Sequence, residues 1–122
     1  MKILITGSRN YKNHEQIRSA LLDLNDEGLI IVHGDCATGA DALADHFGKL
    51  YKFVVRRYPA DWSKDGKAAG PRRNERMFEK EHLPDEPIDF VLAFSEDLES
   101  SRGTSHCVSV ARRYGIEVRL FK

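Results

Sequence analysis

Five short apolar runs, separated by segments with helical periodicity, constrain the fold of this 122-residue chain more than any other feature of its sequence. The runs occupy residues 2–6, 29–33, 53–58, 89–94 and 116–121. Between them, apolar residues recur every three or four positions, as on one face of a helix. These helical segments are residues 13–25, 40–50, about 71–82 and 104–114. Strands that are apolar on both faces and alternate with helices are typical of a parallel sheet covered by helices on both sides.

Right-handed crossover connections leave few ways to order five such strands. We therefore predict an α/β fold: a Rossmann-like three-layer sandwich with a five-stranded parallel sheet, order 3-2-1-4-5, and helices on both faces. The third run ends in polar residues, which favours the edge of the sheet, and the polar residues 59–70 are predicted to form a loop. Because the length suits one domain and no linker interrupts the pattern, residues 1–122 are predicted to form a single domain.

The charges of the chain cancel, with 19 Lys and Arg against 19 Asp and Glu. This balance argues against broad attraction to nucleic acid or to an anionic membrane, and no apolar run approaches the ~18 residues of a membrane span. The chain also starts without a secretory signal, so we expect a cytoplasmic protein whose two cysteines are free thiols. The charges are unevenly spread, because residues 52–82 are basic and residues 83–101 are acidic. The basic block forms either one wall of a site or a set of solvated surfaces.

A ligand site is predicted where the winding of the sheet reverses, beyond the carboxyl ends of the strands. The loops after the first, second and fourth strands converge there, and the loop after the third strand lies beside them. Their sequences are GSRNY (7–11), GDCATGAD (34–41), SSRGTS (100–105) and GKAAGPRRN (66–74). Glycine beside the start of a helix leaves unpaired N–H groups open to a ligand, an arrangement that favours phosphate.

Two common phosphate motifs are excluded. Gly34 and Gly39 have the spacing of a P-loop, but Ala40 and Asp41 stand where that motif needs Lys and Ser or Thr. The turn after the first strand has no second or third glycine, so the usual NAD fingerprint is also missing. The sequence therefore favours a phosphate site of another kind.

Thr38 and Asp41 have the spacing of a capping box, in which Thr38 caps the helix and Asp41 reaches back to it. The Asp41 carboxylate is also suited to accept hydrogen bonds from ribose hydroxyls. Arginine forks that are candidates for phosphate are Arg9, Arg72, Arg73 and Arg102. For each of them, the alternative is a solvated surface arginine.

The sequence signals for catalytic residues are weaker than those for phosphate binding. Cys36 and Cys107 lie near predicted helix starts, which would lower their thiol pKa, and His33 or His106 is near each of them. The alternative to such a Cys–His nucleophile is an inert buried thiol. Carboxylates that could act as a pair are Asp35 with Asp41, or Glu96, Asp97 and Glu99, although the last three also suit a solvated loop.

Three aromatic residues, Tyr11, Tyr58 and Trp62, are able to stack on a base. For Tyr58 and Trp62, the alternative is that they close the core over the third strand. No C-x-x-C motif and no close histidine pair occurs in the sequence. We therefore expect neither a metal ion nor a cofactor.

Taken together, ITGSRNY, VHGDCATGAD, YPADWSKDGKAAGPRRNERM and AFSEDLESSRGTSH resemble the SLOG superfamily. The resemblance is to its small YspA-like (cpYpsA-related) branch from bacteria and phages. It spans nearly the whole chain in order, and its most specific part is the pattern W-x-x-x-G-x-x-A-G-P-x-R-N.

The resemblance implies a Rossmann-like domain that binds a nucleotide or nucleotide-derived phosphorylated ligand at the carboxyl end of the sheet, as a sensing or processing module. It also implies a homodimer. The family positions fall on Gly7, Ser8, Arg9, Gly34, Gly39, Ala40, Asp41, Gly70, Pro71, Arg73, Asn74, Gly103 and Thr104. Backbone N–H groups of Thr38–Asp41 and of Gly103–Ser105 would bind the phosphate, and Asn74 or Asp41 would bind the ribose or base.

The superfamily includes the LOG phosphoribohydrolases and the DprA DNA-processing proteins. LOG enzymes carry P-G-G-x-G-T-x-x-E, and residues 99–107 of this chain lack its first two glycines and its glutamate. Hydrolysis of a nucleotide N-glycosidic bond, with Asp41 or Asp35 as the carboxylate, is therefore the alternative function. Nucleic-acid binding through residues 52–82 ranks third, because it calls for a more basic surface.

Overall fold

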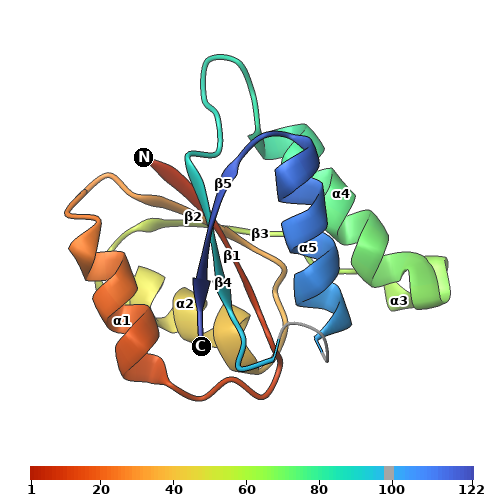
Figure 1. Ribbon diagram of the computed structural model, residues 1–122, viewed down its shortest axis with the longest axis horizontal. Helices are drawn as coiled ribbons and strands as arrows, with labels where there is room; N and C mark the ends of the chain where they lie inside the picture. The colour runs from red at the N-terminus through yellow and green to blue at the C-terminus, as the bar shows by residue number, and fades with distance from the viewer. Residues whose placement is uncertain (98–100) are drawn as a thin grey trace.

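The structure, a computed structural model, describes residues 1–97 and 101–122. Strands and helices alternate along the chain from residue 2 to residue 121 (Figure 1). The strands are β1 (Lys2–Gly7), β2 (Ile30–His33), β3 (Val54–Arg57), β4 (Phe90–Phe94) and β5 (Glu117–Phe121). The helices are α1 (His14–Asp23), α2 (Gly39–Leu50), α3 (Trp62–Asp65), the 3-10 helix η1 (Gly66–Ala68), α4 (Ala69–Glu81) and α5 (Arg102–Arg113).

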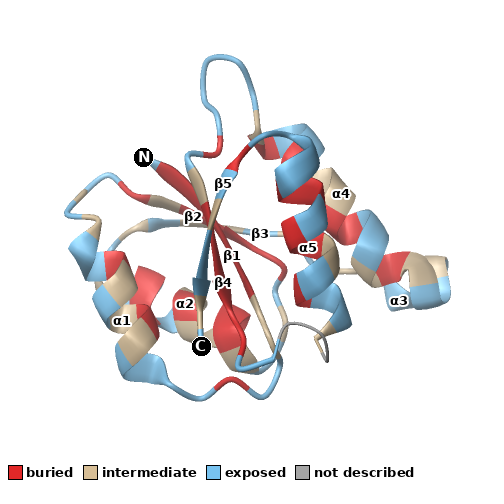
Figure 2. Cartoon of the chain, viewed as in Figure 1, coloured by how far each residue is buried: buried red, intermediate tan, exposed pale blue. Residues whose placement is uncertain are grey.

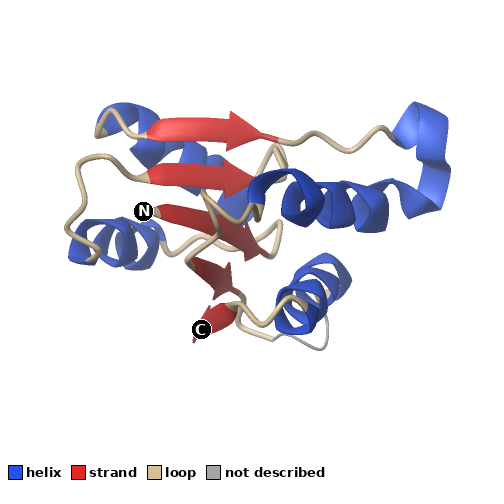
Figure 3. Cartoon of the chain, turned by 90° about the horizontal axis from the view of Figure 1, so that it is seen from above, coloured by secondary structure: helices blue, strands red, loops and turns tan. Residues whose placement is uncertain are grey.

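The five strands form one parallel sheet in the order β3-β2-β1-β4-β5, which confirms the predicted topology. β1 lies at the centre, where Ile3 is level with Ile31 of β2 and Phe90 of β4. β3, the run with the polar end, is at one edge of the sheet as predicted. The strands lie side by side between helices on both faces (Figure 3).

Two apolar cores bind the three layers together. On one face of the sheet, Ile3 and Ile5 of β1 pack with residues of α1 and α2. On the other face, Leu4 packs with residues of α4 and α5. Successive side chains of a strand point to opposite faces, so β1 serves both cores and is buried along most of its length (Figure 2).

The prediction of a loop over residues 59–70 is wrong, because α3, η1 and the start of α4 occupy residues 62–70. The local cause is Asp61, whose carboxylate accepts hydrogen bonds from the Lys64 N–H at 3.1 Å and from the Ser63 hydroxyl at 2.7 Å. This cap starts a helical turn without an apolar stripe. α3 extends past the ends of the strands and overhangs that edge of the molecule (Figure 3).

Candidate ligand-binding pocket

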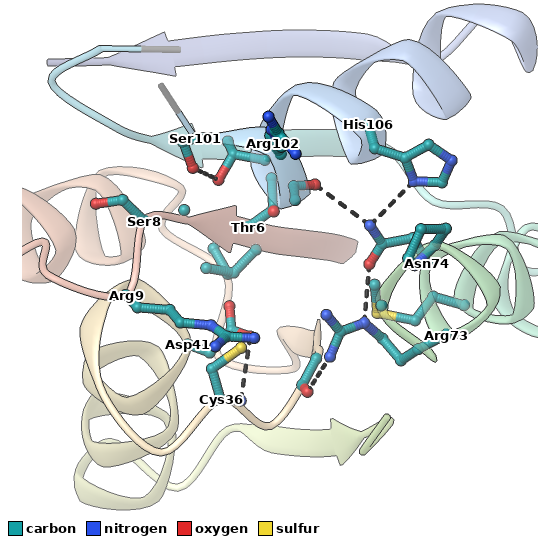
Figure 4. A pocket seen from close by; sticks show the side chains of 18 of the residues that line it. Thr6, Ser8, Arg9, Cys36, Asp41, Arg73, Asn74, Ser101, Arg102 and His106 are labelled. Carbon is teal, nitrogen blue, oxygen red and sulfur yellow. Dashed lines mark hydrogen bonds between the residues drawn. The ribbon is translucent and has the colours of Figure 1, made fainter. Parts of the chain in front are cut away.

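A pocket of about 760 Å³ opens at the carboxyl end of β1, between the loop after β2 and the starts of α4 and α5 (Figure 4). Ligand sites commonly measure about 300–1,000 Å³. Its lining contains eleven of the fifteen residues predicted to bind a ligand: Gly7, Ser8, Arg9, Gly34, Asp41, Gly70, Pro71, Arg73, Asn74, Gly103 and Thr104. The four predicted loops therefore meet in space.

A second hollow of about 400 Å³ adjoins the pocket. Both are lined by Arg9, Gly34, Cys36, Trp62 and Arg73. The second hollow also has Thr38 and Asp35 in its wall, next to residues 59 and 60. The site thus has two compartments that meet at shared residues.

Three predicted residues, Gly39, Ala40 and Ser105, line neither compartment. The Ala40 N–H donates to the Ser8 carbonyl at 3.3 Å, and the Ser105 N–H donates to the Ser101 carbonyl at 2.9 Å. These N–H groups are therefore already bonded within the protein, and the start of α2 packs against the loop after β1. The expected phosphate contact from Gly39 and Ala40 does not fit this geometry.

Arg73 is a buried arginine in the wall of the pocket. Its Nε donates to Asn74 Oδ1 at 2.8 Å, and its Nη1 donates to the Gly34 carbonyl. A Cβ at residue 34 would overlap the Arg73 guanidinium, so a larger residue there requires that side chain to move. Within residues 1–97 and 101–122, no carboxylate oxygen comes within 4.0 Å of the Arg73 guanidinium. Neutral groups therefore hold this guanidinium in place, and it makes no salt bridge with the residues that the structure describes.

Asn74 connects Arg73 to the start of α5 (Figure 4). Its amide oxygen accepts from Arg73, and its Nδ2 donates to the Gly103 carbonyl at 3.3 Å and to His106 Nδ1 at 3.2 Å. Because the amide NH₂ can only donate, His106 Nδ1 accepts, and the ring proton belongs on Nε2. A single buried amide thereby fixes the relative positions of α4 and α5 at the pocket.

Asp41 lies in the wall of the pocket beside Cys36, and its side chain is almost fully buried (Figure 4). Its Oδ2 accepts the Cys36 N–H at 3.3 Å. Burial raises the pKa of this carboxyl, although nearby His33, Cys36 and Arg73 oppose the shift. The capping-box prediction is wrong: Thr38 Oγ1 donates to the Arg9 carbonyl at 2.7 Å and makes no helix cap.

The prediction of lowered thiol pKa values is also wrong. Burial, followed by the charge of Asp41, raises the pKa of Cys36. Burial raises the pKa of Cys107 to about 12, because this residue lies inside α5 and is fully covered. Both thiols are protonated at neutral pH, which disfavours a cysteine nucleophile.

His33 is bonded on both ring nitrogens, which explains why it does not assist Cys36. Its Nδ1 accepts the Asp35 N–H at 2.9 Å, and its Nε2 lies 2.9 Å from Asp45 Oδ1. Burial of Asp45 would raise its pKa, but hydrogen bonds from Arg57, His33 and Lys49 outweigh that effect and lower it. This group is a structural tie between β2, β3 and α2.

Of the remaining residues predicted to contact a ligand, some line the pocket and others do not. Arg9 and Arg102 line the pocket, whereas Arg72 is exposed and pairs with Asp65 at 2.9 Å. Tyr11 is buried against Phe94, with ring centroids 5.6 Å apart, so it closes the core.

Tyr58 donates to Glu81 and lines neither compartment. Glu96 and Asp97 also line neither, and Glu99 and Ser100 lie outside the described residues. Lining residues that the sequence did not single out are Ile5, Thr6, Asn10, Lys67, Met77 and Ser101. Lys67 lies within the predicted site segment 66–74, where a single lysine is not a specific signal, and Thr6 lies within its strand.

No three His, Cys, Asp or Glu side chains gather as a metal site in the part of the chain that the structure describes. Across the same residues, none of the helices is long and apolar enough to cross a membrane.

Comparisons with known proteins agree with this picture. The model of the YspA, cpYpsA-related SLOG family matches residues 1–64. The Gene 61 protein of Mycobacterium phage D29 is 36% identical over 125 residues, covering 96% of this chain and 93% of that protein. Two crystal structures of the C-terminal domain of PF1911 hydrogenase from Pyrococcus furiosus share the fold. They are each 18% identical, with TM-scores of 0.51 and 0.50, and cover 99% and 98% of this chain and 91% and 89% of those chains.

Proposed function

Because the chain belongs to the YspA, cpYpsA-related SLOG family, we propose that its pocket binds a phosphorylated nucleotide or nucleotide-derived small molecule. The family and the α/β fold support a nucleotide-related Rossmann-like module. The pocket would then serve to sense or to process that ligand.

Arg73 is the observation that carries this proposal. Removing a guanidinium from water is costly unless an anion compensates for the lost hydration. Arg73 is 8% exposed, is fixed by Gly34 and Asn74, and faces no carboxylate within 4.0 Å among the described residues. A guanidinium held in one plane suits a phosphate group, to which it can donate two parallel hydrogen bonds.

The start of α5 supplies a second favourable feature for an anion. Gly103 and Thr104 line the pocket in the first turn of this 12-residue helix, where the backbone carries partial positive charge. A Cβ at Gly103 would meet no atom within 4 Å, so a ligand can approach this backbone closely. In this proposal Arg73 and the start of α5 bind the phosphate, Arg9 and Arg102 add positive charge, and Asp41 accepts ribose hydroxyls.

Thermal denaturation with AMP, GTP, ADP-ribose, NAD and cyclic nucleotides tests the proposal. A ligand at 100 times its Kd adds about 2.7 kcal/mol, which raises the Tm of a domain this size by roughly 10 °C. Arg73→Met should weaken binding by about 10- to 150-fold, the value of hydrogen bonds to a charged group. The adjacent Arg72→Met is the matched control and should bind normally, because Arg72 is exposed outside the pocket. No Tm shift with any phosphorylated compound would contradict the proposal.

Asp41 favours a second candidate function, hydrolysis of a nucleotide N-glycosidic bond. Its carboxyl lies in the pocket wall, and its burial-raised pKa makes the ionised form a stronger base. Chromatographic release of free base from nucleoside monophosphates measures this activity. Asp41→Asn should abolish it, and an unchanged rate in that variant would exclude Asp41 as the base.

A further inference from the structure

Trp62 presents a large aromatic surface at the junction of the two compartments. It is the first residue of α3 and remains 51% exposed, although tryptophan is the largest apolar side chain. Hydrogen bonds to the Asp61 carboxylate fix the backbone of this turn. The edge of the indole lies 3.6 Å from the position that a Cβ on Gly70 would occupy, so the ring borders the start of α4. The exposed indole is therefore held in a fixed position in the wall of the site.

One face of the indole already has a planar cation over it. The Cζ of Arg9 lies over the Trp62 ring, 5.6 Å from its centroid. Atoms in stacking contact lie about 3.5–4.0 Å apart, so a third planar ring between these groups needs about 7–8 Å. An outward shift of the Arg9 guanidinium by about 2 Å provides that space. Arg9 is exposed and makes no ion pair within the described residues, so little opposes the shift.

The Trp62–Arg9 pair lies in the same site as the buried Arg73. Trp62, Arg9 and Arg73 line both compartments, so a group stacked on Trp62 shares one continuous space with the buried guanidinium. A single molecule that carries both a phosphate and a flat ring can place the first at Arg73 and the second at Trp62. Aromatic side chains bind nucleic-acid bases by such stacking, and arginine adds to it through its planar cation.

We propose that Trp62 is the stacking surface for an aromatic base, and that this residue makes the pocket select base-containing phosphates over sugar phosphates. The inference rests on the proposed function, because it concerns the same pocket. It adds the part of the ligand that is selected, the base, and the residue that determines this specificity.

The intrinsic fluorescence of the protein tests the inference directly, because Trp62 is the only tryptophan in the chain. The titrants are AMP, GMP, CMP and UMP, with ribose 5-phosphate and inorganic phosphate as matched compounds that lack a base. Nucleotides should quench the emission on saturation, and the compounds without a base should leave it nearly unchanged. Calorimetry should give a Kd for ribose 5-phosphate about 5- to 150-fold weaker than for the best nucleotide, the range measured for base–aromatic stacking.

Two substitutions separate stacking from general packing. Trp62→Leu should reduce nucleotide affinity to that of ribose 5-phosphate and leave ribose 5-phosphate binding unchanged, whereas Trp62→Phe should keep most of the selectivity. Since half of the side chain is exposed, both variants are expected to fold, which circular dichroism verifies.

The outcomes distinguish the two proposals. Equal affinity for nucleotides and ribose 5-phosphate, or unchanged selectivity in Trp62→Leu, overturns the inference and leaves the phosphate site standing. If none of the six compounds binds, the inference falls, and the proposed function falls with it when GTP, ADP-ribose, NAD and cyclic nucleotides also leave the Tm unchanged.

Discussion

Arg73 and Asp41 carry opposite charges in the lining of one pocket, yet no nitrogen–oxygen pair between them lies within 4.0 Å. Each is buried: Arg73 donates to the Gly34 carbonyl and to Asn74 Oδ1, and Asp41 accepts from Cys36. A buried charged side chain lowers the stability of the fold, and a neutral residue in its place would not. Such a side chain is therefore typical of a functional position. The pocket is therefore the part of the fold where substitution can increase stability.

Asp41→Asn should stabilise the empty protein at pH 7. The folded-state pKa of Asp41 is raised above the unfolded value near 3.8, so its ionised form lowers the stability of the fold. That penalty is absent below pH 3.8 and grows as the pH rises through the folded-state pKa. The urea midpoint of Asp41→Asn should thus be higher than that of wild type at pH 7, and the two midpoints should coincide near pH 3.5.

Asp45→Asn, one helical turn away in α2, provides the opposite control. Its pKa is lowered in the folded state, so its carboxylate stabilises the fold above the unfolded value and loses this effect in acid. This variant should be less stable than wild type at pH 7. An Asp41→Asn variant that is also less stable would show that burial does not dominate at Asp41.

The starts of α2 and α5 illustrate how elements with similar sequences take different roles. Both have a glycine in the first turn, Gly39 and Gly103, and the sequence assigned both to phosphate. Gly39 has φ +79°, and a Cβ there would lie 2.2 Å from the Ser8 carbonyl oxygen. Gly39 is thus required for the contact between α2 and the loop after β1, whereas Gly103 faces open space.

Replacing each glycine by alanine should separate these roles. Gly39→Ala should destabilise the protein by about 2 kcal/mol or more, since a positive φ costs about 1–2 kcal/mol and the backbone clash adds to it. Gly103→Ala should leave stability unchanged or raise it by up to about 1 kcal/mol, and should weaken ligand binding. Urea denaturation and calorimetry measure the two effects. Equal stability of the two variants would contradict the packing role of Gly39.

The elements were largely predictable from the sequence, and the roles within the site were not. Buried parallel strands are continuous apolar runs, so their positions and order follow from composition and chain connectivity. α3 was missed because a four-residue helix has no room for an apolar stripe, and Asp61 was its main local signal. The sign of φ at Gly39 depends on its packing against Ser8 and Arg9, which are distant in sequence, so no local pattern revealed it.

At the scale of the whole molecule, the two ends of the sheet differ in whether their buried charges form ion pairs. At the start of β1, Lys2 is buried and pairs with Glu81 at 3.0 Å and with Glu86 at 2.7 Å. Arg56 pairs with the same two carboxylates. This end is a closed network that links β1, β3 and α4, whereas the pocket end keeps Arg73 without a carboxylate partner among the described residues.

Glu81→Gln should destabilise the whole fold by about 3 kcal/mol at pH 7, because it breaks a buried ion pair. Burial alone would raise the pKa of Glu81, but hydrogen bonds from Tyr58, Lys2 and Arg56 outweigh it and lower the pKa. The stabilisation is therefore present above the unfolded value near 4.5 and is lost as the pH falls. Urea denaturation at pH 7 and pH 3.5 should show a difference that shrinks in acid.

Glu117→Gln is the control for this measurement. Glu117 also pairs with an arginine, Arg119, at 2.7 Å, but both side chains are about half exposed. An exposed pair contributes about 0–1 kcal/mol, so this variant should be nearly as stable as wild type. Equal losses in the two variants would show that the buried network has no special weight.

The sheet also has two open edges, β3 and β5, along which another chain could add a strand. Both edges carry charged side chains: Arg56 and Arg57 on β3, and Glu117 and Arg119 on β5. A strand laid along either edge would have to desolvate these groups, so growth of the sheet from molecule to molecule is disfavoured. The fold is thereby protected against fibre-like aggregation at high concentration.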